Sequence, residues 1–478
     1  MLLLLVWVAA ASSSRLYSRD RLKSVEREEE DHSWSSSSTA APGHVRVDTA
    51  TAAPLSPVLY SMFLETEINF GGEGGLYAEQ IRNRDFEALG RGDLGDGLPI
   101  STVPAPDGPQ QTPGLAPNLT DYRPWLPVGA AVVSVENSTA PFASNPMTLR
   151  LKGAAAGDGI SNPGYWGLGC KVGCNLTFYA RVASTETVPV SLQARLRSTA
   201  GNVISSTVAV ALRGANTSSA NGDWHKYSAF LPAPSTIENQ HMATTETFEL
   251  VLESGPAELQ LDHVSVFPSD AVAGCLRRDV VEKLRQLKPG FIRTPGGSYI
   301  IGDGPLTQYN WKQTVGEPAA RPGHYNSAWG YWVRRHQTEF SRTIEGQVSE
   351  VQAFLHPSFS CTELLQVTDG LGFYELLRLG EELGSEIAMA VQDGQHSGPG
   401  RRYTTNAEYS ELVIDAVDML HFANGECNAS TTNSSFGRCR WADLRAAMGH
   451  QQPFGMKRVE IGNEEVDEPT GEHESVAV

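Results

Sequence analysis

The sequence lacks the patterns that mark several common kinds of catalytic and binding site. No Gly-x-Ser-x-Gly segment occurs, which argues against the nucleophilic serine of an α/β-hydrolase. The glycine-rich stretch 71–75 is not followed by Lys-Ser or Lys-Thr, so it is not a phosphate-binding loop. No Cys-x-x-Cys pair or histidine cluster has metal-ligand spacing. We therefore expect neither a metal site nor a cofactor.

Basic residues and long apolar runs are also scarce. Lys and Arg number 37 against 55 Asp and Glu, a net charge of −18, so the surface repels nucleic acid and anionic membranes but suits a neutral sugar polymer. The one long apolar run, Leu2 to Ala11, is too short to cross a bilayer and ends in a cleavage-like Ala-x-Ala. It indicates a signal peptide, or else a frayed apolar start. Residues 12–44 are rich in Ser, Arg and Glu, which predicts a disordered leader.

Cysteines and glycosylation sequons agree with export. Six cysteines suit an oxidising compartment. Cys170 with Cys174, and Cys427 with Cys439, are plausible local pairs, whereas Cys275 and Cys361 stay unassigned. Six Asn-x-Ser/Thr triplets predict surface positions in a secreted glycoprotein: Asn118, Asn137, Asn175, Asn216, Asn428 and Asn433. We therefore expect an extracellular or cell-wall location.

The length of 478 residues allows at least two hydrophobic cores, and 46 Gly with 28 Pro imply many turns. Residues 57–69 predict an apolar strand that ends in carboxylates, and after the turn at 71–75 residues 76–89 predict a short helix. Residues 90–124 are loop-like. From about 125 to 270 the pattern changes to short β-rich runs separated by Gly, Asn, Ser and Pro, at 147–153, 175–183, 190–198, 224–231, 248–254 and 259–267. This spacing predicts a jelly-roll β-sandwich.

After Ala273 helical and strand patterns alternate. Three helices are predicted, each with one apolar face: 276–287 (Val280, Val281, Leu284, Leu287), 368–384 (Phe373, Leu376, Leu377, Leu383; capped by Thr368 or Asp369, with Gly384 after its end) and 404–425 (Leu412, Val413, Ala416, Val417, Leu420; capped by Thr404 or Thr405). Three strands, at 290–297, 386–394 and 457–465, end in polar or glycine-rich residues. Together with 57–69 they predict about four strands of a (β/α)8 TIM barrel, into which the sandwich is inserted.

The pair Asn463-Glu464 closes the last predicted strand. A carboxyl at a strand end in a barrel mouth suits a proton donor to a leaving oxygen, and a neighbouring amide suits a sugar hydroxyl. A solvated strand end is the alternative interpretation of this dipeptide. The position of Asn463-Glu464 after a fourth strand favours the catalytic interpretation.

Several segments in order resemble the eukaryotic α-L-arabinofuranosidases of glycoside hydrolase family 51: residues 63–87, 287–297, 309–332, 368–384, 444–454 and 459–465. The 125–270 block resembles the carbohydrate-binding-like sandwich of these enzymes. The implied domains are 57–92 with 275–466 for the first half of the catalytic barrel, 125–270 for the sandwich and 467–478 for a tail. The implied activity is retaining hydrolysis of terminal α-L-arabinofuranosyl groups from arabinan, arabinoxylan or glycoproteins. The alternative is a truncated, non-catalytic carbohydrate-binding protein.

The resemblance also implies roles for single residues. Glu464 matches the acid/base and Asn463 the contact to the sugar 2-hydroxyl. Glu65 matches a carboxylate that binds arabinose hydroxyls, with Glu67 as a rival. Arg293 matches the arginine before the Pro-Gly-Gly turn and is thereby implied to bind substrate; a salt bridge at the core edge is the alternative.

Three departures from the family pattern follow. Ser298 stands where many bacterial relatives have Asn. Residues 333–367 interrupt a stretch that the family joins directly, and we expect this insertion to be poorly packed. Nothing after Glu464 resembles strands five to eight or the nucleophile, a second Glu. We therefore expect this chain to be incomplete and nearly inactive by itself.

Overall fold

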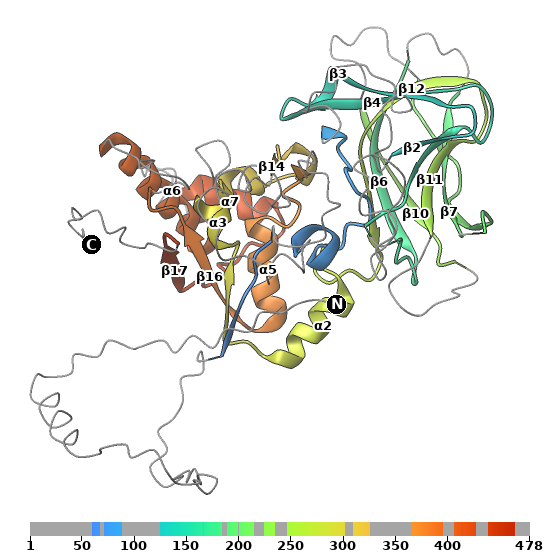
Figure 1. Ribbon diagram of the computed structural model, residues 1–478. Coiled ribbons are helices and arrows are strands. Elements are labelled where there is room, and N and C mark those ends of the chain that lie inside the picture. Colours follow the sequence, from blue (N-terminus) through green and yellow to red (C-terminus); the bar gives the residue numbers. More distant parts are fainter. Residues whose placement is uncertain are drawn as a thin grey trace, which may run out of the picture.

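The computed structural model describes residues 60–66, 71–87, 125–165, 167–183, 189–198, 200–214, 224–234, 246–301, 309–325, 366–394, 406–426 and 438–463. The predicted signal peptide, the leader, the tail and residues 333–365 lie outside these ranges. Figure 1 shows a β-sandwich beside a smaller parallel sheet with its helices.

The parallel sheet contains four strands in sequence order. β1 (Ser61–Phe63) pairs with β13 (Phe291–Thr294), which pairs with β16 (Glu386–Val391), and β17 (Arg458–Ile461) follows. These are the four strands expected from the sequence. Because β1 pairs directly with β13, all sandwich strands are inserted between them along the chain.

One face of this sheet is apolar and packs on helices. Met62, Ile292, Ile387 and Met389 alternate with residues of the other face and join one buried cluster. The helices of this region are α2 (Arg278–Leu287), α3 (Gly297–Ile301), α5 (Phe373–Leu383), α6 (Asn406–Asn424) and α7 (Arg438–Ala447). Shorter elements are the 3-10 turns η5 (Trp311–Thr314) and η6 (Pro318–Ala320) and the paired strands β14 (His324–Tyr325) and β15 (Gln366–Val367). The strand pair joins the two flanks of the segment 326–365.

Three details of the predicted helices were wrong. In α6 the buried residues are Met419, Phe422 and Ala423, whereas the expected inward residues Val413, Val417 and Leu420 are exposed. The aromatic ring of Trp311 packs on Phe422, and Lys312 pairs with Asp415 and Asp418. These tertiary contacts determine which face of α6 is buried. The proposed caps of α6 at 404 and 405 lie outside the described residues.

The end of α2 and the start of α5 also differ. Leu287 is 39% exposed, because α2 ends there before the turn into β13. The N-cap of α5 is Gly372, whose backbone N–H donates to the carboxylate of Glu375. Gly384 ends α5 in the left-handed conformation, as expected from the sequence.

The sandwich consists of two antiparallel sheets. The first has the order β10 (His225–Leu231), β6 (Cys174–Val182), β12 (Ala257–Pro268), β4 (Asn145–Gly153) and β3 (Val132–Phe142). The second has the order β2 (Leu126–Val128), β5 (Gly159–Asn162), β11 (Thr247–Leu252), β7 (Ser191–Arg197) and β8 (Val203–Ser206), with β9 (Val210–Ala211) beside β7. Alternate residues of β6 and β7 are buried, which is the period-two pattern of strands with one face on a core.

The predicted helix at 76–89 is wrong. A π-helical turn, η2 (Gly72–Leu76), is followed by irregular chain up to Glu87. Glu79, Arg84, Asp85 and Glu87 are at most 3% exposed there. Charged side chains that pair with the sandwich thus override the helical periodicity of this segment.

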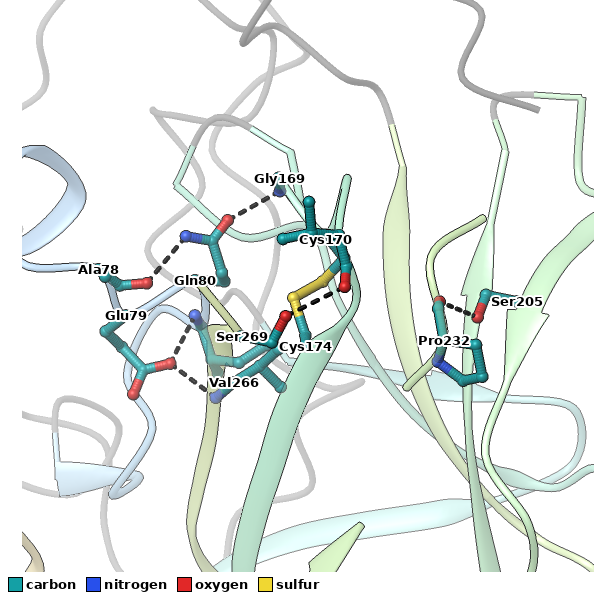
Figure 2. The surroundings of a disulfide bond; sticks show 12 residues. Ala78, Glu79, Gln80, Gly169, Cys170, Cys174, Ser205, Pro232, Val266 and Ser269 are labelled. Atoms are coloured by element: carbon teal, nitrogen blue, oxygen red, sulfur yellow. Dashed lines mark hydrogen bonds between the residues drawn. A yellow bond between two sulfur atoms is a disulfide. The ribbon is translucent and has the colours of Figure 1, made fainter. Parts of the chain in front are cut away.

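Hydrogen bonds to two carboxylates, Glu73 and Glu79, anchor this segment to its surroundings. Glu79 accepts hydrogen bonds from the backbone of Val266 in β12, as Figure 2 shows. The carboxylate of Glu73 accepts from Tyr165 and from the backbone of Thr368. Residues 71–87 therefore connect the sandwich to the chain that leads into α5.

The expected disulfide Cys170–Cys174 is present and closes the turn before β6 (Figure 2). Cys439 is disulfide-bonded, but its expected partner Cys427 lies outside the described residues, as does Cys361. Cys275 is a free thiol, and burial raises its pKa to about 12.

Replacing Cys170 and Cys174 together by Ser is expected to lower the free energy of unfolding by about 2 kcal/mol, because the short loop they close gains freedom in the unfolded chain. Urea unfolding of the oxidised protein measures this difference. Cys275→Ser, which removes only a free thiol, is the matched control. Equal unfolding midpoints for the double variant and the unsubstituted protein would contradict the prediction.

Of the six sequons, Asn175 is exposed in β6 and Asn137 lies in β3. Asn118, Asn216, Asn428 and Asn433 lie outside the described residues. None of the helices in the described ranges has the length and apolarity needed to cross a membrane.

Candidate functional site

Three of the predicted site residues meet at the carboxyl-terminal edge of the parallel sheet. Glu65 follows β1 by two residues, Arg293 lies near the end of β13, and Asn463 follows β17 by two residues. Parallel strands bring these ends to one edge, although the residues are far apart in sequence.

Arg293 is the centre of this group. Its Nη2 donates to Oδ1 of Asn463 at 2.8 Å, and its Nη1 lies 3.6 Å from Oε1 of Glu65. Its Nε and Nη2 also donate to the two carboxylate oxygens of Glu460, at 2.5 and 3.0 Å. The guanidinium carbon lies 5.1 Å from the ring centre of Phe63. The side chain is thus held on several sides and is only 9% exposed.

The Pro-Gly-Gly turn after β13 holds the residues around Arg293 in place. Backbone hydrogen bonds join Leu64 to Arg293 and Thr66 to Pro295, which keeps the chain around Glu65 against the turn. Gly297 contacts Asn463 so closely that an added Cβ would lie 2.1 Å from Oδ1. A glycine is therefore required for the amide to occupy its place.

On the role that the resemblance implies for Asn463, Gly297→Ala is expected to displace its amide and to weaken binding of L-arabinose by about tenfold or more, because small displacements in a binding site are costly. Calorimetric titration with L-arabinose measures the effect. Gly214→Ala is the matched control, since nothing lies within 4 Å of its added Cβ. Unchanged affinity in Gly297→Ala would show that the amide does not contact the sugar.

Glu464 and the rival carboxylate Glu67 lie outside the described residues. Ser298 lies in α3. The alternative interpretation of Arg293, an ion pair at the core edge, describes its contact with Glu460, and the same guanidinium also contacts Asn463 and Glu65.

Glu460 was missed by the sequence analysis. Its signal was a single carboxylate between Val459 and Ile461, within the predicted strand 457–465. Alternation along the strand places Glu460 on the face opposite to its two apolar neighbours. Among the described residues no group of three or more His, Cys, Asp or Glu is arranged to hold a metal ion.

Chemically, this edge offers two carboxylates, a guanidinium and an amide within one hydrogen-bonded group. Carboxylates accept hydrogen bonds from hydroxyls, and amides both donate and accept. Such a set suits a polyhydroxylated neutral ligand, in agreement with the acidic surface of the protein.

Comparison with known proteins agrees with this chemistry. A family model described as "Alpha-L-arabinofuranosidase 1 domain" matches residues 283–475, which include Arg293 and Asn463. The chain is 28% identical to Alpha-L-arabinofuranosidase 2 of Arabidopsis thaliana over 434 residues, 88% of this chain and 51% of that protein. It is 28% identical to the Extracellular exo-alpha-L-arabinofuranosidase of Streptomyces chartreusis over 88% of this chain and 42% of that protein.

This chain is therefore similar in sequence to α-L-arabinofuranosidases over most of its length. A solved structure agrees at the level of the fold: an arabinose-bound α-L-arabinofuranosidase of family GH51 superposes with a TM-score of 0.61 at 24% identity, covering 85% of this chain and 54% of that one. The chain spans about half the length of the arabinofuranosidases from Arabidopsis that it matches.

Proposed function

We propose that the protein hydrolyses terminal, non-reducing α-L-arabinofuranosyl groups of arabinan, arabinoxylan or glycoproteins. The observation that carries the proposal is the contact of Arg293 with both Asn463 and Glu65. The family resemblance assigns these three residues to sugar binding, and the parallel sheet brings them to one edge. In this proposal Glu65 and Asn463 bind sugar hydroxyls, and Arg293 orients both.

The proposed mechanism retains the anomeric configuration. Glu464, next to Asn463 in the sequence, protonates the leaving oxygen and later activates water. A second glutamate attacks the anomeric carbon from a position about 5–5.5 Å from the first carboxyl.

The proposed architecture follows from the same resemblance. Residues 57–92 and 275–466 contribute the first four strands of a (β/α)8 barrel, and 125–270 form an inserted carbohydrate-binding-like sandwich. The order β1-β13-β16-β17 supports this proposal, since the strands of a barrel pair in sequence. The apolar start and the sequons support secretion to the cell exterior or wall, where arabinose-containing polysaccharides are the substrate.

The test is hydrolysis of an aryl α-L-arabinofuranoside by purified 1–478 and by a longer form that carries a family-matched nucleophile. The longer form is expected to release the aryl alcohol with retention of configuration. Absence of hydrolysis in both forms would contradict the proposed function. Comparable turnover would mean that 1–478 already contains a nucleophile.

A further inference from the structure

Glu460 reaches Arg293 across an intervening strand. The two residues lie on β17 and β13, with β16 between them, and they share one face of the sheet. On β16, Ala388 stands opposite Arg293 and Ala390 stands opposite Glu460. Neighbouring strands are about 4.8 Å apart, so the two backbones are separated by about 10 Å. Two alanines leave that space open, and the ion pair occupies it.

The two hydrogen bonds from Arg293 to Glu460 set the plane and direction of the guanidinium. Arginine carries donors only, so the group of Asn463 that faces it must be the acceptor, Oδ1. The nitrogen of the same amide is then turned away from Arg293. Gly297 packs against the amide, at 2.8 Å from Nδ2 for an ideal Cβ, which limits its rotation.

We propose that Glu460 is a positioning residue that acts through Arg293 to present Asn463 to the substrate as a hydrogen-bond donor. The inference rests on the proposed function, because the partner of Asn463 is a hydroxyl oxygen of the arabinofuranosyl group. With Nδ2 facing the sugar, the amide donates and the hydroxyl accepts. Without Glu460, the guanidinium loses its fixed direction and the amide loses its preferred orientation.

The consequence is a specificity that depends on Glu460. L-Arabinose carries a 2-hydroxyl for Asn463, and 2-deoxy-L-arabinose does not. The intact protein should bind L-arabinose about three- to tenfold more tightly than the 2-deoxy sugar, which is the usual effect of one hydrogen bond. In Glu460→Ala this ratio should fall to about one. If Glu460 had a merely structural role, its replacement would weaken the binding of both sugars alike and leave the affinity ratio unchanged.

The experiment is calorimetric titration of both sugars into purified 1–478 and its variants. Glu460→Gln is the second variant; its amide oxygen accepts one of the two hydrogen bonds from Arg293, so the ratio should fall part of the way. Glu386→Ala is the matched control. It removes a carboxylate from the same sheet that pairs with Arg458 at 2.6 Å and Lys457 at 3.2 Å, at the opposite end of the strands.

The outcomes separate the inference from the function on which it rests. If the ratio of the affinities for L-arabinose and 2-deoxy-L-arabinose is unchanged in Glu460→Ala or in Glu460→Gln, the inference about Glu460 is overturned. The proposed function is not affected by that result. If the affinity ratio falls to about one in Glu386→Ala, the inference about Glu460 is overturned as well, because any ion pair of the sheet would then have the same effect. If unsubstituted 1–478 binds neither sugar, the role of Glu460 in sugar binding is overturned, whereas the proposed function is decided separately by hydrolysis in the longer form.

Discussion

In the active enzyme, replacing Glu464 by Gln is expected to slow hydrolysis of arabinan by about 10²–10⁴-fold, the usual contribution of a general acid. Glutamine has the same size but carries no proton to give to the leaving sugar oxygen. An aryl arabinofuranoside with an acidic phenol needs little protonation, so its hydrolysis should slow much less. The ratio of the two rates is the quantity to measure.

Glu465→Gln is the matched control, because it makes the same change one residue further along the chain. We expect it to leave both rates close to those of the unsubstituted enzyme. If Glu464→Gln slowed the two substrates equally, the residue would not be the proton donor. If Glu465→Gln gave the substrate-dependent loss instead, the acid/base would have to be moved to that position.

Replacing Glu79 by Ala is expected to lower the free energy of unfolding by about 3–5 kcal/mol, because it leaves a buried arginine without its ion-pair partner. Glu79 and Arg84 are 3% and 1% exposed and lie 3.3 Å apart. The Glu79 carboxylate also accepts from the backbone N–H groups of Ile81 at 3.0 Å and Val266 at 2.9 Å. The substitution removes these acceptors at once. Urea unfolding followed by circular dichroism measures the loss.

A double variant separates the pair from its surroundings. Burial raises the pKa of the Glu79 carboxyl, and Arg84 acts in the opposite direction, so for this carboxylate desolvation outweighs the attraction to Arg84. Replacing Glu79 by Leu and Arg84 by Met together should therefore cost less than either replacement alone. Additive losses would show that the two residues stabilise the fold independently.

An exposed ion pair of the sandwich provides the control for this comparison. Arg150 is 45% exposed, and its partner Glu258 is 21% exposed. Glu258→Ala is expected to cost less than about 1 kcal/mol, because water screens such pairs. A loss as large as that in Glu79→Ala would contradict the assignment of the effect to burial.

Local sequence patterns determined most of the elements. Short β-rich runs separated by Gly, Asn, Ser and Pro predicted six sandwich strands, which are β4, β6, β7, β10, β11 and β12. The four strands of the parallel sheet were predicted with their order, and Gly384 predicted the end of α5. These features depend on contacts between neighbours in the chain or on faces that repeat along one element, which a sequence displays directly. The family motifs, which are also runs of neighbouring residues, predicted Glu65, Arg293 and Asn463 as site residues.

Only the tertiary structure decided which charged residues are buried and which faces pack. Residues 76–89 have a helical pattern, yet the described part, 77–87, is irregular chain against the sandwich, where Glu79 and Arg84 form a buried ion pair. The sequence did not identify Glu460 as a partner of Arg293, because their pairing depends on the two alanines that β16 places between them. Both outcomes depend on pairs of residues more than 160 positions apart, or on desolvation by another domain's surface. Periodicity along one segment contains no information about such pairs, because their energies arise when distant elements exclude water together.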